Sequence, residues 1–346
     1  MKTSDFQYDL PEELIAQTPI TPRDASRMLV CNRENGLREG RIFRDLPDYL
    51  RPEDVMVINH TRVIPARLLG VKQETGVAVE LLLLRRVDAN TWESMVKPGR
   101  RLHAGTEVVF GDGLLRAVIG ETLPGGTRQV SFRYEGLFEN ILEKLGEMPL
   151  PPYIHERLTD PGRYQTVYAK FDGSAAAPTA GLHFTPEVME RIRAKGVDIV
   201  PVLLHVGLGT FRPVKEEDAD KHEMHSEYYE VSEEAAARIN RARERGGRIV
   251  CIGTTSVRTL ETLADEQGIV HAGSGMTSIF IKPGVQLRAT DVLLTNFHLP
   301  QSTLLMLVSA FMGRENALDA YRQAVSEKYR FFSFGDCMLI GSGLVR

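Results

Sequence analysis

The sequence predicts an α/β protein: a discontinuous α/β layered domain with an inserted small all-β barrel domain. Three observations predict this organisation. Helical and strand periodicities alternate over residues 150–346. Short apolar pieces that suit the same layer occur in residues 1–62, and residues 63–149 hold closely spaced strand patterns with little helical periodicity. We therefore expect residues 1–62 and 150–346 to form the α/β domain and residues 63–149 to form the insertion.

The first part contributes two apolar strand patterns to the layer, at 28–31 and 55–58. The insertion follows with six patterns of short β-branched or alternating runs separated by turn residues. They cover residues 67–72, 77–87, 92–97, 106–110, 114–119 and 128–134. Closure of six short strands into a barrel removes the exposed sheet edges, so we expect a closed barrel here.

The last part alternates between the two periods. Thr185 before Pro186 is a typical N-cap with proline at the first helical position, and Ser232 before two glutamates opens a second helix. We expect helices at 186–195, 233–245, 302–312 and 315–329 and a further helix that begins after Gly253. The expected strands are 197–206, 248–253, 277–281 and 292–297.

The composition is that of a globular chain. Of 346 residues, 42% are apolar and 25% charged, which excludes a disordered chain and a collagen. The net charge of −4 excludes a uniformly basic, histone-like coat for nucleic acid. No apolar run approaches the roughly 20 residues that a membrane span requires, and the first residues are polar, so we expect a cytoplasmic protein with no membrane partner. Cys31, Cys251 and Cys337 lack any C-x-x-C pairing and are expected to be small core residues.

Positive charge is concentrated in the insertion, which carries a net charge of +1 over residues 62–150. The candidates for a nucleic-acid contact are Arg85, Arg86, Lys97, Arg100 and Arg101. A solvated face is the simpler explanation of the same residues. If nucleic acid is a partner, a local patch of this kind would have to hold it.

Four loops rich in glycine, histidine and small hydroxyl residues lie where strands meet helices, which is where open α/β sheets carry their sites. They are 173–184, 205–211, 253–258 and 295–300. The third is the clearest, because a Gly-Thr-Thr-Ser turn opens a helix and offers free backbone N–H groups to an anionic or polar ligand. The alternative is that Thr254, Thr255 or Ser256 only caps that helix.

Two shorter motifs are weaker. Gly207-Leu208-Gly209 lacks the third glycine of a dinucleotide fingerprint, and a tight turn explains it equally well. His222-Glu223-Met224-His225 would place two histidines on one helical face, but its spacing fixes no third ligand, and we expect no metal. By contrast, His183, His205 and His298 each end an apolar run beside a loop, where an imidazole can act as an acid or a base.

Long strings of the chain, from about Asp5 to Ile340, resemble the S-adenosylmethionine:tRNA ribosyltransferase-isomerase family of queuosine biosynthesis. The strings are Asn59 with 61–67, then 148–154, 164–168, 176–184, 205–214, 224–227, 253–260, 296–310 and 329–336. Three positions depart from the family pattern: Ser278, where Asp or Asn is common, Val285, where an aromatic residue is usual, and Phe334, where Tyr is frequent. Of these, only Ser278 is expected to remove a polar group from contact with substrate.

The resemblance implies a reaction in which the ribosyl part of S-adenosylmethionine moves onto 7-aminomethyl-7-deazaguanine at the wobble position of tRNA and rearranges. The products are epoxyqueuosine-tRNA, adenine and methionine. S-adenosylmethionine is then a consumed co-substrate, and the anticodon loop of tRNA is the partner. An S-adenosylmethionine-dependent RNA methyltransferase and a non-catalytic RNA-binding protein are the alternatives. The sequence does not fix the oligomeric state, and a monomer is the simplest expectation.

Residue roles follow from the chemistry that the resemblance implies. A sulfonium acidifies the adjacent ribose C5′ hydrogens, so a base must remove a proton while an acid assists the departure of adenine. His183, His205 and His298 are the candidates, with His225 behind them. An aromatic face or a carboxylate would favour the sulfonium, and an arginine fork suits the methionine carboxylate. The expected substrate contacts are Thr179, Phe184, Gly207, Gly209, Phe211, Glu227, Thr254, Thr255, Ser256, Arg258 and Asn296.

Overall fold

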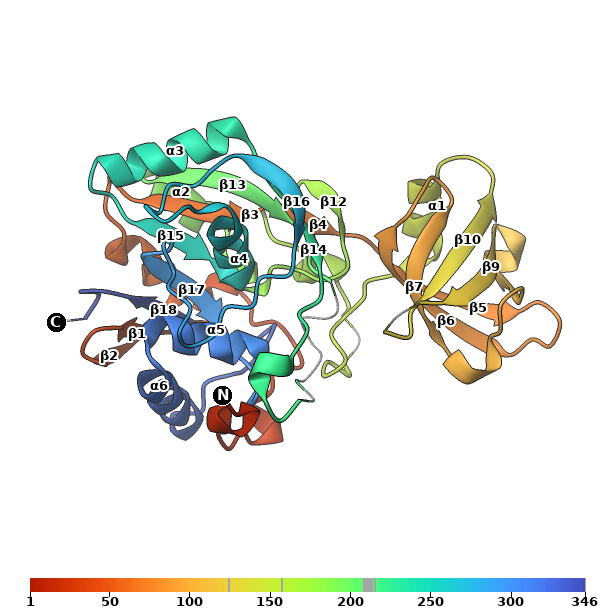
Figure 1. The fold of residues 1–346 in the computed structure, drawn as a ribbon, viewed down its shortest axis with the longest axis horizontal. Coiled ribbons are helices and arrows are strands. Elements are labelled where there is room, and N and C mark those ends of the chain that lie inside the picture. The colour runs from red at the N-terminus through yellow and green to blue at the C-terminus, as the bar shows by residue number, and fades with distance from the viewer. Residues whose placement is uncertain (124, 157, 208–213, 215, 346) are drawn as a thin grey trace. The chain divides into compact units, whose positions relative to one another are not determined.

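Figure 1 shows the computed structural model, which describes residues 1–346 apart from 124, 157, 208–213, 215 and 346. The chain divides into two compact units. Met1–Thr61, Pro152–Phe171 and Ala177–Arg346 form the first, and Arg62–Pro151 with Asp172–Ala176 form the second. The first unit is a layered α/β structure and the second is built around a closed antiparallel barrel, so the predicted fold class is confirmed. That residues 63–149 fold as a domain on their own stays a prediction.

A nine-stranded sheet organises the α/β unit. Its spatial order is β16 (Gly273–Thr277), β14 (Glu227–Val231), β13 (Asp198–Leu204), β3 (Val55–Asn59), β15 (Ile249–Ile252), β17 (Val292–Asn296), β18 (Cys337–Gly341), β1 (Arg27–Asn32) and β2 (Arg38–Ile42). The central strands β13, β3, β15 and β17 are parallel, and β18 runs antiparallel to β17. The loops after the four parallel strands and the loop before β18 therefore meet at one edge of the sheet.

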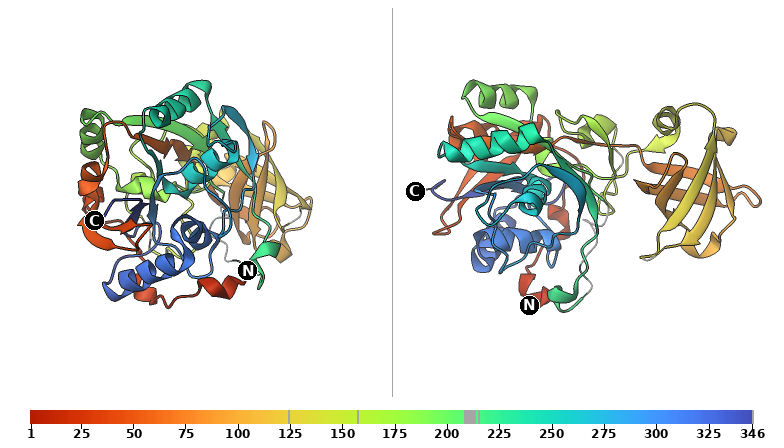
Figure 2. Two further views of the ribbon diagram at one scale, coloured as in Figure 1. Left: turned by 60° about the vertical axis from the view of Figure 1, so that its left-hand side comes forward. Right: turned by 45° about the horizontal axis from the view of Figure 1, so that its top comes forward.

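Both faces of this sheet are covered, which is why its central strands are continuous apolar runs. The helices are α2 (Pro186–Ala194), α3 (Glu233–Glu244), α4 (Gly253–Leu263), α5 (Thr303–Met312) and α6 (Arg314–Ser326). Alternate residues of β3 enter different cores: Val55 and Val57 pack with the residues of α3 to α6, and Met56 and Ile58 pack with those of α2. The turned views show the green helix α2 and the blue pair α5 and α6 on opposite sides of the sheet (Figure 2).

The barrel closes through six strands. The ring consists of β5 (Arg67–Lys72), β6 (Ala78–Arg86), β7 (Thr91–Lys97), β10 (Arg128–Tyr134), β9 (Leu115–Thr122) and β8 (Glu107–Phe110), and pairing of β8 with β5 completes it. The short strand β11 (Gly146–Glu147) adds to β5, and helix α1 (Phe138–Leu145) buries Phe138, Ile141 and Leu142 in the barrel core. A separate two-stranded sheet pairs β4 (Thr61–Val63) with β12 (Phe171–Ser174).

Some expected elements were wrong or missing. The strand expected at 277–281 was placed wrongly. The observed strand, β16, covers Gly273–Thr277 and pairs with β14 as the edge of the sheet. The helix expected to reach residue 329 ends at Ser326, and Lys328 takes a positive φ of 57° that no helix continues. The sequence interpretation also omitted β2, β14 and β18.

The three cysteines are free and buried, as expected of core residues, and burial raises the pKa of Cys31 to about 12. Within the described ranges, no helix combines the length and the apolar character needed to cross a bilayer.

Candidate active site

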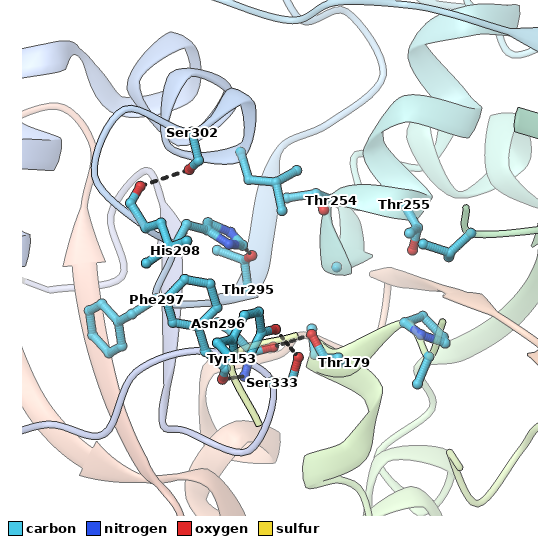
Figure 3. A pocket seen from close by; sticks show the side chains of 18 of the residues that line it. Tyr153, Thr179, Thr254, Thr255, Thr295, Asn296, Phe297, His298, Ser302 and Ser333 are labelled. Atoms are coloured by element: carbon cyan, nitrogen blue, oxygen red, sulfur yellow. Dashed lines mark hydrogen bonds between the residues drawn. The ribbon is translucent and has the colours of Figure 1, made fainter. Parts of the chain in front are cut away.

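A pocket opens at the edge of the sheet where the parallel strands end, and it lies wholly within the α/β unit (Figure 3). It holds about 770 Å³ of empty space, including solvent at its mouth. Five residues named from the sequence line it. These are Thr179, Thr254, Thr255, Asn296 and His298. Its described lining contains no Asp, Glu, Lys or Arg, so its walls are polar but uncharged apart from any charge on His298.

The first turn of α4 forms one wall of the pocket, through Gly253, Thr254 and Thr255. No side chain caps this helix, so the alternative in which a hydroxyl residue serves only as its cap is wrong. Ser256 is buried, and its Oγ donates to the carbonyl of Ile252 (2.9 Å), so it faces away from the pocket lining. The buried Oγ1 of Thr255 has no hydrogen-bond partner among the described residues. Backbone N–H groups and a spare hydroxyl are therefore available to a ligand.

Thr179 and Asn296 join two walls of the pocket. Thr179 begins the short 3₁₀ helix η8 (Thr179–His183), Asn296 is the last residue of β17, and the Thr179 Oγ1 donates to the Asn296 Oδ1 (3.1 Å). The other end of the Asn296 amide lies 3.2 Å from Nε2 of His183. Nδ1 of His183 lies 2.7 Å from the Oγ of Ser26, and Phe43 stacks on the ring. His183 is thus a buried residue behind the wall and does not line the pocket.

His298 does line the pocket, and it is the one predicted catalytic histidine that does so. Its Nε2 lies 2.9 Å from the Oγ1 of Thr295. Burial lowers the pKa of His298 to about 3, and burial with the charges of Arg23 and Arg330 lowers the pKa of His183 to a similar value. Both rings are therefore neutral at pH 7, which is the form that can accept a proton.

A second cluster, centred on a buried carboxylate, lies beside the pocket-lining residue Val206. Oε1 of Glu227 accepts from the N–H of Gly207 (2.8 Å) and lies 3.0 Å from Nε2 of His225, and Oε2 pairs with Nη1 of Arg258. Burial favours the neutral acid, but Arg258, His225 and the Gly207 amide hold the pKa of Glu227 below its usual value. Nε and Nη2 of Arg258 are buried and have no partner among the described residues.

The remaining predicted residues are dispersed. His205 follows β13, and its Nδ1 lies 2.9 Å from the Oγ1 of Thr61 while its ring stacks on Tyr228. Phe184 is fully buried and packs edge-on against Phe43, so it presents no face to the pocket. Gly209 and Phe211 lie outside the described residues.

Sequence reasoning missed several pocket residues. Tyr153 comes from the segment after the insertion, Phe332 and Ser333 from the loop before β18, Thr295 from β17 and Ser302 from the N-cap of α5. The Tyr153 hydroxyl lies 2.6 Å from the Ser333 Oγ, and the Tyr153 ring packs on Phe332. Residues 148–154 and 329–336 resemble the family, and this was the available signal, but neither segment contains a motif that indicates a chemical role.

The histidine motif at 222–225 does not form a helix. Nδ1 of His222 pairs with Glu216 (2.9 Å) and His225 pairs with Glu227, so the two imidazoles have separate partners. No group of three His, Cys, Asp or Glu side chains suited to a metal ion occurs in the described part of the chain.

The basic residues of the barrel fall into two groups. Arg85 and Arg86 lie near one end of β7, where Arg86 is opposite Trp92, and pair with Glu93 (3.1 Å) and Glu139 (3.0 Å). Lys97, Arg100 and Arg101 lie at the other end of β7, roughly 17 Å away by strand geometry. All five are exposed, and the second group makes no ion pair with any described residue.

The three departures from the family pattern lie outside the pocket lining. Ser278 is exposed, Val285 packs at the margin of the core that contains α3 to α6, and Phe334 is buried against Tyr164.

Comparison with known proteins gives a consistent result. A family described as "Queuosine biosynthesis protein" matches residues 3–340. A protein of Symbiobacterium thermophilum named S-adenosylmethionine:tRNA ribosyltransferase-isomerase is 63% identical over 98% of this chain and 100% of its own length, and one of Moorella thermoacetica with the same name is 60% identical over the same shares. The crystal structure of S-adenosylmethionine tRNA ribosyltransferase from Thermotoga maritima matches 97% of this chain and 100% of its own with 40% identity and a TM-score of 0.56.

Proposed function

The chain belongs to the queuosine biosynthesis protein family, and we propose on that premise that the pocket at the end of its parallel strands is where S-adenosylmethionine reacts. The chain is a transferase that moves the ribosyl part of S-adenosylmethionine onto tRNA and isomerises it. The acceptor is 7-aminomethyl-7-deazaguanine at the wobble position, and the products are epoxyqueuosine-tRNA, adenine and methionine.

One observation carries the assignment of the pocket: the uncapped first turn of α4 opens into it beside a buried hydroxyl that has no partner among the described residues. A helix N-terminus stabilises a carboxylate, and free N–H and hydroxyl groups hydrogen-bond ribose and carboxylate oxygens. S-adenosylmethionine carries both kinds of group. Thr254 and Thr255 are the proposed contacts, with Thr179 and Asn296 on the facing wall.

The aromatic side of the pocket suits the other part of the co-substrate. Tyr153 and Phe332 pack together there with their ring centroids 4.3 Å apart. Aromatic faces stack with a purine and stabilise a sulfonium cation, and no described lining carboxylate competes for that cation. Glu227, paired with Arg258, is instead proposed to hold the Gly207 turn beside the pocket. Arg258 remains a proposed carboxylate ligand through Nε and Nη2, which have no partner among the described residues.

His298 is the proposed base. It is neutral, it lines the pocket, and Thr295 holds its Nε2. Removal of a C5′ proton beside the sulfonium then leads to departure of adenine, with a general acid at the base. The other three histidines are proposed to support the walls of the pocket. His183 contacts Asn296 and Ser26, His205 contacts Thr61, and His225 contacts Glu227.

The test is to follow adenine release by His298→Ala with substrate tRNA. We expect a loss of about 10²- to 10⁴-fold, the usual contribution of a general base. The matched control is His271→Ala, because His271 is exposed, follows the C-terminal end of α4 and pairs with Asp265 (2.8 Å). Near-normal turnover by a folded His298→Ala protein would remove His298 from the mechanism. Recovery of S-adenosylhomocysteine in place of adenine and methionine would indicate a methyltransferase instead.

The anticodon loop is the proposed tRNA contact, since its bases are single-stranded and need little unpairing to enter a pocket. The exposed barrel residues Arg85, Arg86, Lys97, Arg100 and Arg101 are proposed to track phosphates. Binding should then weaken steeply between low and physiological salt. We also propose a cytoplasmic location, which the tRNA substrate supports, and a monomeric state.

A further inference from the structure

Three arginines gather on loops of the α/β unit, at 18–23, 160–165 and 330. Arg23 donates to the carbonyls of Gly162 (2.8 Å), Gln165 (2.8 Å) and Leu182 (3.3 Å). Arg163 donates back to the Thr21 Oγ1 (2.8 Å) and the Ile20 carbonyl (2.5 Å). Arg330 donates to the carbonyl of Thr18. The loops of Arg23 and Arg163 thus exchange arginines, and Arg330 is tied to the loop that leads to Arg23.

Every acceptor in this cluster is neutral. None of Arg23, Arg163 and Arg330 forms an ion pair with a carboxylate of the described residues. The acidic side chains near these loops have other partners. Asp24 pairs with Arg44 and Glu327 with Arg27, each at 3.4 Å. Asp160 accepts from the N–H of Gly162, and Asp336 accepts from the N–H groups of Arg27 and Arg330 at 2.8 Å each. Carbonyls orient guanidinium groups but do not neutralise them, and the nearby carboxylates Asp160 and Asp336 are two against three arginines, so a net positive charge remains.

The surroundings of Arg23 and Arg330 disfavour their charged forms. Burial and the charge of Arg163 lower the pKa of Arg23, against the opposing charge of Asp160, and burial lowers the pKa of Arg330, against the opposing charge of Asp336. Nε of Arg163 is buried and has no hydrogen-bond partner among the described residues. The three side chains are half-buried, so each keeps part of its surface open to solvent. An anion at this place would supply the missing acceptor and relieve the repulsion between the cations.

The cluster is next to the pocket. Arg23 holds the carbonyl of Leu182 in η8, the helix that begins with the pocket residue Thr179, and Arg330 precedes the pocket residues Phe332 and Ser333. Arg23 and Arg330 also both act electrostatically on His183, whose Nε2 meets the pocket residue Asn296.

We propose that Arg23, Arg163 and Arg330 form a phosphate-binding site for the RNA backbone beside the nucleotide that enters the pocket. The site rests on the proposed function for the identity of the nucleic acid. A phosphate suits it because a guanidinium fork matches phosphate oxygens, and because the nucleotide at the reaction centre necessarily carries phosphates on both sides. It also gives the α/β unit a tRNA contact of its own, separate from the exposed cations of the barrel.

The experiment measures the affinity of the full-length protein for an unmodified anticodon stem-loop RNA as a function of salt. Arg163→Gln and Arg330→Gln should each reduce the slope of log K against log salt by about 1 and weaken binding several-fold at about 50 mM salt. Arg163→Lys should restore most of the slope because it keeps the charge. The matched control is Arg193→Gln on α2, which removes an exposed cation paired with Glu190 (3.7 Å) and should leave the slope unchanged.

Several results would overturn the site. One is an unchanged slope in folded Arg163→Gln and Arg330→Gln proteins, and a second is a loss in Arg163→Lys as large as in Arg163→Gln, which would indicate a purely structural arginine. Competition by inorganic phosphate that depends on the arginines, with RNA affinity independent of them, would assign the site to a free anion. Release of adenine by the wild type at saturating tRNA is scored separately, so that the proposed function stands or fails on its own measurement.

Discussion

Asn296 donates a hydrogen bond to Nε2 of His183 across 3.2 Å, and its other contacts fix the direction of that bond. The same amide nitrogen donates to the carbonyls of Phe332 (3.2 Å) and Asp336 (3.4 Å), which can only accept. Nε2 of His183 must therefore be unprotonated, and Nδ1 carries the proton toward Ser26. One amide thus sets the tautomer of a buried histidine and joins the pocket wall to the loop before β18.

Replacing Asn296 by alanine should lower the free energy of unfolding by about 2–3 kcal/mol, because His183 and Thr179 lose partners in a buried setting. Denaturant unfolding measures it. The exposed Gln267→Ala serves as the control and should change stability by less than about 0.5 kcal/mol. An Asn296→Ala protein as stable as the control would show that water replaces the amide at no cost.

Stability should fall as the pH falls from 7 to 5, with His183 and His298 as contributors. Each has a pKa of about 3 in the folded state and about 6.5 in the unfolded state. The unfolded chain therefore binds more protons between pH 7 and 5, and the free energy of unfolding falls as the pH falls. The loss should be about 2 kcal/mol for each histidine between pH 7 and 5. Urea unfolding of the wild type and of His183→Gln at both pH values measures it, and equal pH dependence in the two proteins would contradict the assignment.

Glu227→Gln should cost about 3–5 kcal/mol, because it leaves the charge of Arg258 buried without its carboxylate. The double variant Glu227→Gln with Arg258→Met removes that charge and should recover part of the loss. Thermal or denaturant unfolding of the four proteins gives the coupling energy between the two sites. Additive losses would mean that the two side chains do not stabilise each other.

Gly70→Ala should destabilise the barrel by about 1–3 kcal/mol, because an added Cβ would lie 2.5 Å from Cδ1 of Phe110 and 2.6 Å from the carbonyl of Val109, where β5 meets β8. The single tryptophan, Trp92, lies in the barrel core, so its fluorescence reports this unit. Gly99→Ala meets no atom within 4 Å and should leave the fluorescence transition in place. A barrel transition that is the same in both variants would argue against tight closure.

The strands of the barrel were predictable because they are short β-branched or alternating runs separated by turn residues, and the expected 128–134 strand matches β10 residue for residue. The edge strand β16, with its sequence Gly-Ser-Gly-Met-Thr, has no such pattern and is defined by its pairing with β14. In the same way, the pocket residues Thr254 and His298 follow apolar strands and were recognisable. Tyr153 and Ser333 come from distant loops whose meeting depends on tertiary structure, and no local signal marks them.

The parallel pairing of β1 with β18 joins Met28 to Cys337, close to the two ends of the chain. During synthesis, β1 has no β18 partner until Cys337–Gly341 have been made. The six ring strands of the barrel, in contrast, all lie between Arg67 and Tyr134, so their partners become available soon after one another. Non-local pairings form slowly and leave strands exposed meanwhile. We therefore expect the barrel to fold on the ribosome before the α/β unit, whose sequence flanks it on both sides. Until β18 is made, β1 can pair with its other neighbour, β2.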